Sequence, residues 1–91
     1  MYTLVWTPKF TRAAEKFVKH HGELARKFTD ILHDLEHDPF QAHLKYHHLS
    51  GKLKGFQAIS LTDSYRITLT VVISEKEITL IDIGSHDEVY R

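Results

Sequence analysis

The chain has 91 residues, 12 basic and 12 acidic side chains, and a hydrophobic fraction of 42%. This length supports one domain with a single core, and the composition excludes an intrinsically disordered protein. The absence of cysteine excludes disulfides and cysteine-ligated zinc. Neither a signal peptide nor a run approaching the roughly 20 apolar residues of a membrane span is present. We therefore expect a single domain, residues 1–91, that is cytoplasmic and has no membrane partner.

The first predicted elements are a strand and a helix. Residues 2–6 alternate between apolar and other side chains, which is typical of a strand. Thr7-Pro8 then indicates a helix start, because threonine is a good N-cap and proline is tolerated at the first helical position. The apolar stripe of this helix is Phe10, Ala13, Ala14, Phe17 and Val18. We expect Gly22 to cap its C-terminal end.

A second amphipathic helix follows after a short connection. Its apolar stripe is Leu24, Phe28, Ile31, Leu32 and Leu35. It should end near Asp38, because a residue before proline disfavours helical backbone. The short connection predicts two antiparallel helices, and their shared apolar faces need a sheet to pack against.

Three apolar runs, residues 56–61, 65–73 and 78–83, predict an antiparallel meander. In the second run, alternate residues from Tyr65 to Ile73 are expected on one face. The third run is apolar on both faces, which favours a central strand. We expect it to end in a sharp turn at Gly84. The order β-α-α-β-β-β predicts an α+β domain, with a helical hairpin packed on a small, twisted, mainly antiparallel sheet.

The sequence contains eight histidines, and two pairs have a spacing of four residues. His33 and His37 lie on the polar side of the second helix. His43 and His47 lie on one face only if their segment is helical. Such pairs bind zinc weakly without a third ligand, and none is evident. We therefore expect solvated histidines, no metal and no cofactor.

Residues 39–62 contain no acidic side chain. The basic and titratable residues of this window are Lys45, Lys52, Lys54, His43, His47 and His48. Acidic side chains are frequent on both sides of it. The window is compatible with a local anion site on a neutral protein, and equally with an ordinary solvated loop.

One set of residues has the inventory that RNA cleavage needs: His47, His48, Lys52, Lys54, Arg66, His86 and Tyr90. In that reaction one group removes the 2′-OH proton, cations stabilise the phosphate, and an acid protonates the departing 5′-oxygen. Histidine serves either proton-transfer role, and arginine binds phosphate oxygens. Spacing alone does not separate this interpretation from unrelated surface residues.

Three motifs resemble the RelE/ParE toxin superfamily: Leu-Ser-Gly-Lys-Leu-Lys-Gly (residues 49–55), Asp-Ser-Tyr-Arg-Ile (63–67) and Ile-Gly-Ser-His-Asp-Glu-Val-Tyr-Arg (83–91). The His-x-Leu-x-Gly of residues 47–51 and the Gly-Ser-His of the tail are most similar to the YafQ branch. The final Asp-Glu-Val-Tyr-Arg is nearer the RelE type. The resemblance implies the RelE-like microbial RNase fold and a toxin of a type II toxin–antitoxin system. It also implies a ribosome-dependent endoribonuclease that cleaves messenger RNA through 2′-OH attack.

The resemblance also implies roles for individual residues. His86 would be the leading proton-transfer residue and His47 the second, with the base and the acid unassigned between them. Arg66 would hold the scissile phosphate, and Tyr90 would orient the substrate. The implied substrate-binding residues are Lys52, Lys54 and His48. The implied partners are a cognate antitoxin, the ribosome and messenger RNA, with DNA contacted only through the antitoxin complex.

Two alternatives remain within this superfamily: a gyrase-poisoning toxin that resembles ParE, and a catalytically degenerate member that only binds its antitoxin. Ser60 stands where the YafQ branch has a histidine, and Asp63 does not match its following aspartate cleanly. For antitoxin docking the candidates are Arg12 and Lys16, from a basic stripe on the first helix that also holds Lys9 and Lys19. A solvated helix face explains that stripe equally well.

Overall fold

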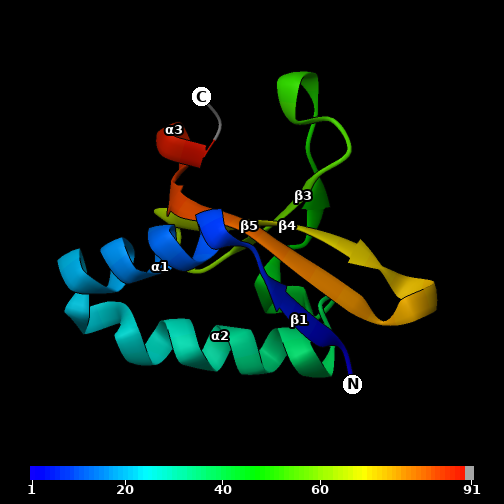
Figure 1. Cartoon of the computed structure of the whole chain (residues 1–91), viewed down its shortest axis with the longest axis horizontal. Helices are drawn as coiled ribbons and strands as arrows, with labels where there is room; N and C mark the ends of the chain where they lie inside the picture. Colours follow the sequence, from blue (N-terminus) through cyan, green and yellow to red (C-terminus); the bar gives the residue numbers. More distant parts are fainter. Residues whose placement is uncertain (90–91) are drawn as a thin grey trace.

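A sheet runs through the middle of the molecule, with two long helices on one of its sides (Figure 1). The computed structural model describes residues 1–89, so that Tyr90 and Arg91 lie outside the described residues. The elements in order are β1 (Thr3–Trp6), α1 (Pro8–His20), α2 (Ala25–His37), β2 (His47–His48), β3 (Gln57–Ser60), β4 (Tyr65–Val72), β5 (Glu77–Ser85) and α3 (His86–Val89). The predicted α+β class is confirmed.

The start of α1 is the one that Thr7-Pro8 predicts. The Phe10 N–H donates to the Thr7 hydroxyl oxygen at 3.1 Å, and the Thr7 hydroxyl donates to the carbonyl of Leu80 at 2.7 Å. Pro8 occupies the first turn, where a backbone N–H would have no acceptor within the helix, so the missing N–H of proline costs no hydrogen bond. The Thr7 side chain therefore caps α1 and also ties it to β5.

Replacing Thr7 with alanine should destabilise the protein by about 1 to 2 kcal/mol, because a helix cap is lost and the Leu80 carbonyl loses a donor. The free energy of unfolding in urea measures this change. Thr7→Ser keeps the hydroxyl and is the matched control, expected to lie close to the wild type. Equal unfolding midpoints for the alanine variant and the wild type would contradict the double role of this side chain.

The connection between the helices differs from the prediction at Gly22. Helix α1 ends at His20, and His21 is the capping residue, with its N–H bonded to the Phe17 carbonyl at 2.8 Å. The His21 ring packs on Phe17 and Tyr65, at centroid distances of 4.7 and 4.8 Å, which holds the helix end in place. Gly22 instead opens a short 3₁₀ turn, Gly22–Leu24. The predicted end of α2 is confirmed, since Asp38 caps it before Pro39.

The sheet has the strand order β1-β5-β4-β3-β2 within residues 1–89. Strands β2 to β5 pair in antiparallel fashion, while β1 pairs with β5 in parallel. The predicted central position of β5 is therefore confirmed. Strand β2, which was not predicted, pairs His47 with Ala58 and His48 with Gln57. Two residues are too short a segment to show a strand period.

Two local predictions for the sheet are wrong. Ile73 does not line the apolar face, because β4 ends at Val72 and Ile73 enters a 3₁₀ turn, where it is 63% exposed. Gly84 does not make a sharp turn, because β5 continues through Ser85 and Gly84 pairs with Arg66 inside the ladder. A register shift between Thr68 and Leu69 also interrupts the regular alternation of the β4–β5 pair.

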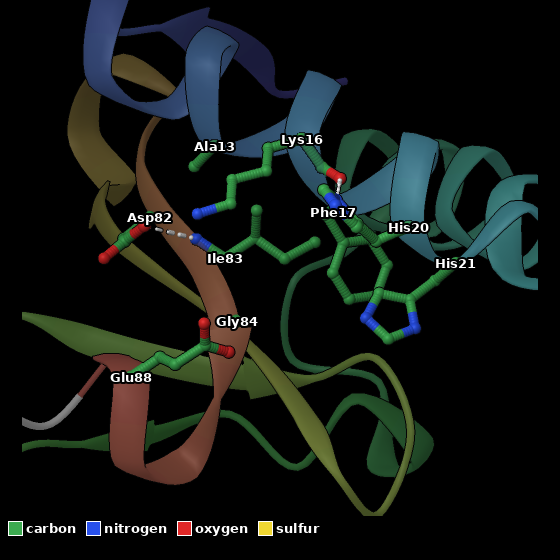
Figure 2. Close-up of a pocket in the computed structure, with 9 residues that line it drawn as sticks. All are labelled: Ala13, Lys16, Phe17, His20, His21, Asp82, Ile83, Gly84 and Glu88. Atoms are coloured by element: carbon green, nitrogen blue, oxygen red, sulfur yellow. Dashed lines mark hydrogen bonds between the residues drawn. The ribbon is translucent and has the colours of Figure 1, made fainter.

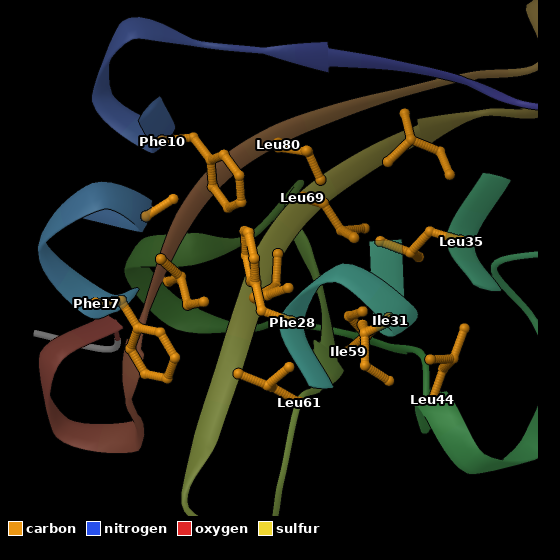
Figure 3. Packing of buried hydrophobic residues seen from close by; sticks show 14 residues of the cluster. Phe10, Phe17, Phe28, Ile31, Leu35, Leu44, Ile59, Leu61, Leu69 and Leu80 are labelled. Carbon is orange, nitrogen blue, oxygen red and sulfur yellow. The ribbon is translucent and has the colours of Figure 1, made fainter. Parts of the chain in front are cut away.

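The buried hydrophobic side chains form a cluster between the helices and the sheet (Figure 3). Phe10 of α1 and Phe28 of α2 stack at a centroid distance of 6.2 Å, which joins the two helices. Leu69 and Leu80, on adjacent central strands, are fully buried on the sheet side of the cluster. Within residues 1–89 no helix is long and apolar enough to cross a membrane. The helices thus cover one face of the sheet, while α3 and the loop after β2 stand on the far side from α2 (Figure 1).

Candidate functional site

A groove of about 410 Å³ brings four of the predicted site residues together. It is lined by His47, His48, Leu49, Ser50, Lys52, Leu53 and His86. These residues come from β2, from the loop that follows it and from the first position of α3, which are far apart in the sequence. The groove therefore combines three titratable imidazoles with a fixed cation, as an acid–base site on an anionic substrate requires.

The backbone determines which nitrogen of His47 carries a proton. Its Nδ1 lies 2.9 Å from the carbonyl oxygen of Lys45. A carbonyl only accepts, so Nδ1 is the donor, and the lone pair of the neutral ring is on Nε2. Lys45 adopts a left-handed conformation with φ 54°, which directs the chain from the preceding 3₁₀ turn into β2. His47 is thus held in the tautomer that accepts a proton at Nε2.

His86 reaches the groove from the opposite wall. It is the first residue of α3, immediately after β5. Its side chain is 62% exposed, and its Nδ1 lies 3.8 Å from a carboxylate oxygen of Asp87. The ring is accessible to a substrate, and the first turn of α3 carries it.

The loop after β2 presents Lys52. Gly51 and Gly55 have φ values of 65° and 99°, which other residues rarely adopt, and they border the turn that carries Lys52. Leu49 N–H bonds to the Phe56 carbonyl at 3.0 Å and closes the base of the loop. Lys54 is exposed at the end of this turn and does not line the groove.

Beside the groove, His48 packs against Tyr46 at a centroid distance of 5.6 Å. Burial raises the pKa of the Tyr46 hydroxyl, because the phenolate would lose solvation. Tyr46 therefore contributes a neutral ring next to His48 and no negative charge that would oppose an anionic substrate.

Arg66 lies on the same face of the sheet as His47, but outside the lining of the groove. His47 is opposite Ala58, which is opposite Thr68, and Arg66 lies two residues before Thr68 on β4. Two strand spacings across the sheet and two residues along β4 place the Cα atoms of Arg66 and His47 roughly 12 Å apart. Its direct neighbours in the ladder are Ser60 and Gly84. The other predicted site residue, Tyr90, lies outside the described residues.

The histidine pairs singled out as weak metal candidates have other partners. His37 Nδ1 lies 2.9 Å from the His33 carbonyl, which is an internal helix contact. His43 Nε2 lies 2.8 Å from Asp34 and joins the loop after α2 to that helix. In the part of the chain that the structure describes, no three histidine, aspartate or glutamate side chains are placed to hold a metal ion.

A second cavity, of about 320 Å³, lies between α1, β5 and α3 (Figure 2). The acidic side chains at this cavity lie beside part of the basic stripe on α1. Lys9 pairs with Asp82 at 3.5 Å, and Lys16 lines this cavity together with Asp82 and Glu88. Two members of the stripe therefore face acidic side chains of β5 and α3, whereas Arg12 is simply exposed.

Ser85 and Glu88, which lie on either side of His86 in the chain, were not among the predicted site residues. Their backbone and side chains exchange two hydrogen bonds. The pattern Ser-x-x-Glu is a known signal for a helix start and would have identified both residues. It went unnoticed because a helix was not expected after the last strand.

No protein-family model and no curated protein sequence matches the chain. Solved structures do. YafQ from E. coli strain BL21(DE3) has a TM-score of 0.82 at 15% identity, with 100% of both chains covered. A YoeB/ParE toxin from Agrobacterium tumefaciens has 0.75 at 23% identity, covering 94% of this chain and 99% of that one. The E. coli DinJ-YafQ complex gives 0.79 at 16% identity, with 100% of both chains covered. The predicted resemblance to RelE/YafQ-type toxins is thus confirmed at the level of the fold.

Proposed function

We propose that this chain, which has the fold of the RelE/YafQ-type toxins, is the toxin of a type II toxin–antitoxin pair and cuts messenger RNA on the ribosome in the cytoplasm. The observation that carries the proposal is the groove in which His47, Lys52 and His86 meet on the face of the sheet opposite to the helices. A ribonuclease of this kind needs two proton-transfer groups and a cation within reach of one phosphate.

The tautomer of His47 assigns the two proton-transfer roles in this proposal. Nε2 of His47 removes the proton of a ribose 2′-OH, and the 2′-oxygen attacks the adjacent phosphorus. The bond from phosphorus to the 5′-oxygen breaks as protonated His86 donates its proton to that oxygen. The products are a 2′,3′-cyclic phosphate and a 5′-hydroxyl. The reaction needs no redox partner and no cofactor, and its protons balance between the two imidazoles.

The cationic side chains are proposed to stabilise the negative charge that develops on the phosphate. Lys52 lines the groove, and Arg66 lies on the same sheet face, where it can bind a phosphate oxygen as the strand of RNA crosses the sheet. His48 lines the groove and Lys54 ends the turn that carries Lys52, and both are proposed to contact neighbouring phosphates. Tyr90 is proposed to orient the substrate, by its position in the tail motif alone.

Replacing Lys52 with alanine should lower the affinity for RNA and reduce the salt dependence of binding by about one phosphate contact. The slope of the logarithm of the association constant against the logarithm of the salt concentration measures this. Lys27→Ala is the matched control, because Lys27 is exposed on α2, on the other side of the sheet. An equal salt slope for Lys52→Ala and the wild type would remove Lys52 from the substrate path.

The proposed partner is a protein antitoxin, and the similarity to YafQ in the DinJ-YafQ complex supports this choice. Arg12 and Lys16 are the proposed contacts on α1 for acidic side chains of that partner. Because Asp82 and Glu88 stand beside Lys16, a docking segment would meet charges of both signs there. Operator DNA would be contacted only through the complex.

Primer extension on a translated reporter messenger RNA, after induction of the chain, tests the proposed function. Discrete breaks inside translated codons are expected, and they should disappear when the start codon of the reporter is removed. Toxicity with gyrase-dependent DNA damage and intact RNA would instead support a ParE-like toxin. Soluble protein with neither toxicity nor breaks would indicate a member that only binds its antitoxin.

A further inference from the structure

We propose that Glu88 is a positioning residue: through reciprocal hydrogen bonds with Ser85 it fixes the first turn of α3 and thereby holds His86 at the groove. The kinetic consequence of this inference rests on the proposed function. The geometric part concerns the end of β5 and stands without it.

The first observation is the pair of bonds that enclose His86. The Ser85 N–H donates to a carboxylate oxygen of Glu88 at 2.9 Å, and the Glu88 N–H donates to the Ser85 hydroxyl oxygen at 3.2 Å. This arrangement is a capping box, and it satisfies two N–H groups that the start of a helix leaves without an intrahelical acceptor. His86 and Asp87 are the two residues within this closed loop.

The second observation is the close approach of Glu88 to Gly84. A Cβ at Gly84 would lie 3.1 Å from Oε1 and 3.2 Å from Cβ of Glu88, both tighter than ordinary contact. Gly84 has no left-handed backbone, since the glycines with positive φ in residues 1–89 are Gly51 and Gly55. Space for Glu88, and not backbone conformation, therefore favours a glycine here. In Figure 2 the Glu88 carboxylate lies directly against Gly84.

The third observation is the shortness of the helix that carries His86. The described part of α3 has four residues, and an isolated helix of this length is not stable in water. The His86 side chain is 62% exposed. The capping box and the side chain of Val89, which is 6% exposed, both anchor this turn. Loss of the box would let His86 move relative to His47, which is held independently by β2.

A carboxylate near an imidazole could also act through its charge. Two substitutions separate position from charge. Glu88→Gln removes the charge but keeps an amide oxygen that accepts the Ser85 N–H, so the capping box persists. Asp87→Ala removes a carboxylate that is 3.8 Å from His86 and leaves the capping box intact, because the Asp87 side chain is 96% exposed and outside the box.

The experiment compares RNA cleavage by the full chain and by Glu88→Ala, Glu88→Gln and Asp87→Ala on programmed ribosomes. Glu88→Ala should lower the cleavage rate constant by about 10- to 100-fold, because small misplacements of a reacting group have effects of this size, while the substrate concentration for half-maximal rate changes little. Glu88→Gln and Asp87→Ala should stay close to the wild type. Full activity of Glu88→Ala, or a glutamine variant as slow as the alanine variant, would overturn the proposal.

Nuclear magnetic resonance provides a readout that does not depend on cleavage. In Glu88→Ala the Ser85 amide should lose protection from hydrogen exchange and the His86 ring signals should shift, whereas Glu88→Gln should retain both. If the wild type does not cleave RNA, the proposed function fails and these signals still decide the geometric inference. Unchanged Ser85 protection and His86 signals in Glu88→Ala would reject it.

Discussion

Replacing either His47 or His86 with alanine is expected to lower the rate of messenger RNA cleavage by about 10²- to 10⁴-fold, the usual contribution of a general acid or base. The two rings line one groove but come from separate elements, β2 and the start of α3, so neither substitution disturbs the backbone of the other. Cleavage of a translated reporter by purified variants at equal protein concentration measures the effect.

His33→Ala and His37→Ala are the matched controls for this prediction. Both histidines are exposed on α2, which lies on the other side of the sheet from α3, and their removal should leave cleavage unchanged.

His47→Asn is a further test of the assigned tautomer. Its amide can still donate to the Lys45 carbonyl but cannot accept a proton as a base, so it should be as slow as His47→Ala. Because the two histidines act in one step, the double variant should be little slower than the slower single variant. Near-normal cleavage by His47→Asn would contradict the role of His47 as the base.

Replacing Phe10 with alanine should destabilise the protein by about 3 to 5 kcal/mol, because a large side chain is lost from a closed core. Phe10 is fully buried, and its ring contacts Trp6 at 5.0 Å and Phe28 at 6.2 Å between centroids. Natural domains have a free energy of unfolding of only about 5 to 15 kcal/mol. The variant should therefore be partly unfolded at temperatures near 37 °C. Urea unfolding followed by circular dichroism measures the loss.

Phe40→Ala is the matched control for Phe10→Ala. Phe40 is 43% exposed and packs edge-on against Tyr46, so its removal leaves no closed cavity. We expect a loss below about 1 kcal/mol, as for exposed substitutions. Equal losses for the two phenylalanines would mean that the Trp6–Phe10–Phe28 contact is not part of the core that stabilises the fold.

The local pattern of the sequence predicted the helices and the long strands well. Thr7-Pro8 identifies the start of α1, and Asp38-Pro39 identifies the end of α2, because caps and proline act within a few residues of themselves. The interior position of β5, between β1 and β4, followed from the apolar residues on both of its faces, because an interior strand is covered more fully than an edge strand.

Other features depend on contacts between distant segments. Strand β2 exists because His47 and His48 meet β3, and a segment of two residues has no period of its own. The cap of α1 is His21 rather than Gly22, because its ring packs on Tyr65, more than forty residues away. Gly84 appeared to be a turn residue, and only the position of Glu88 shows that the missing Cβ makes room for a side chain.

The candidate site likewise has some features that follow from the sequence and others that depend on contacts between distant segments. The inventory of the site is readable from residue types alone: histidines and lysines in an acid-free window, Arg66 on a predicted strand, and a histidine after the last strand. The tertiary structure decided that His47, Lys52 and His86 share a groove, while Lys54 and Arg66 do not line it. Residue types and their neighbours in the chain determine which chemistry the side chains can perform. The distance between residues 39 positions apart, such as His47 and His86, depends instead on strand pairing and on the hydrophobic core that orients the sheet.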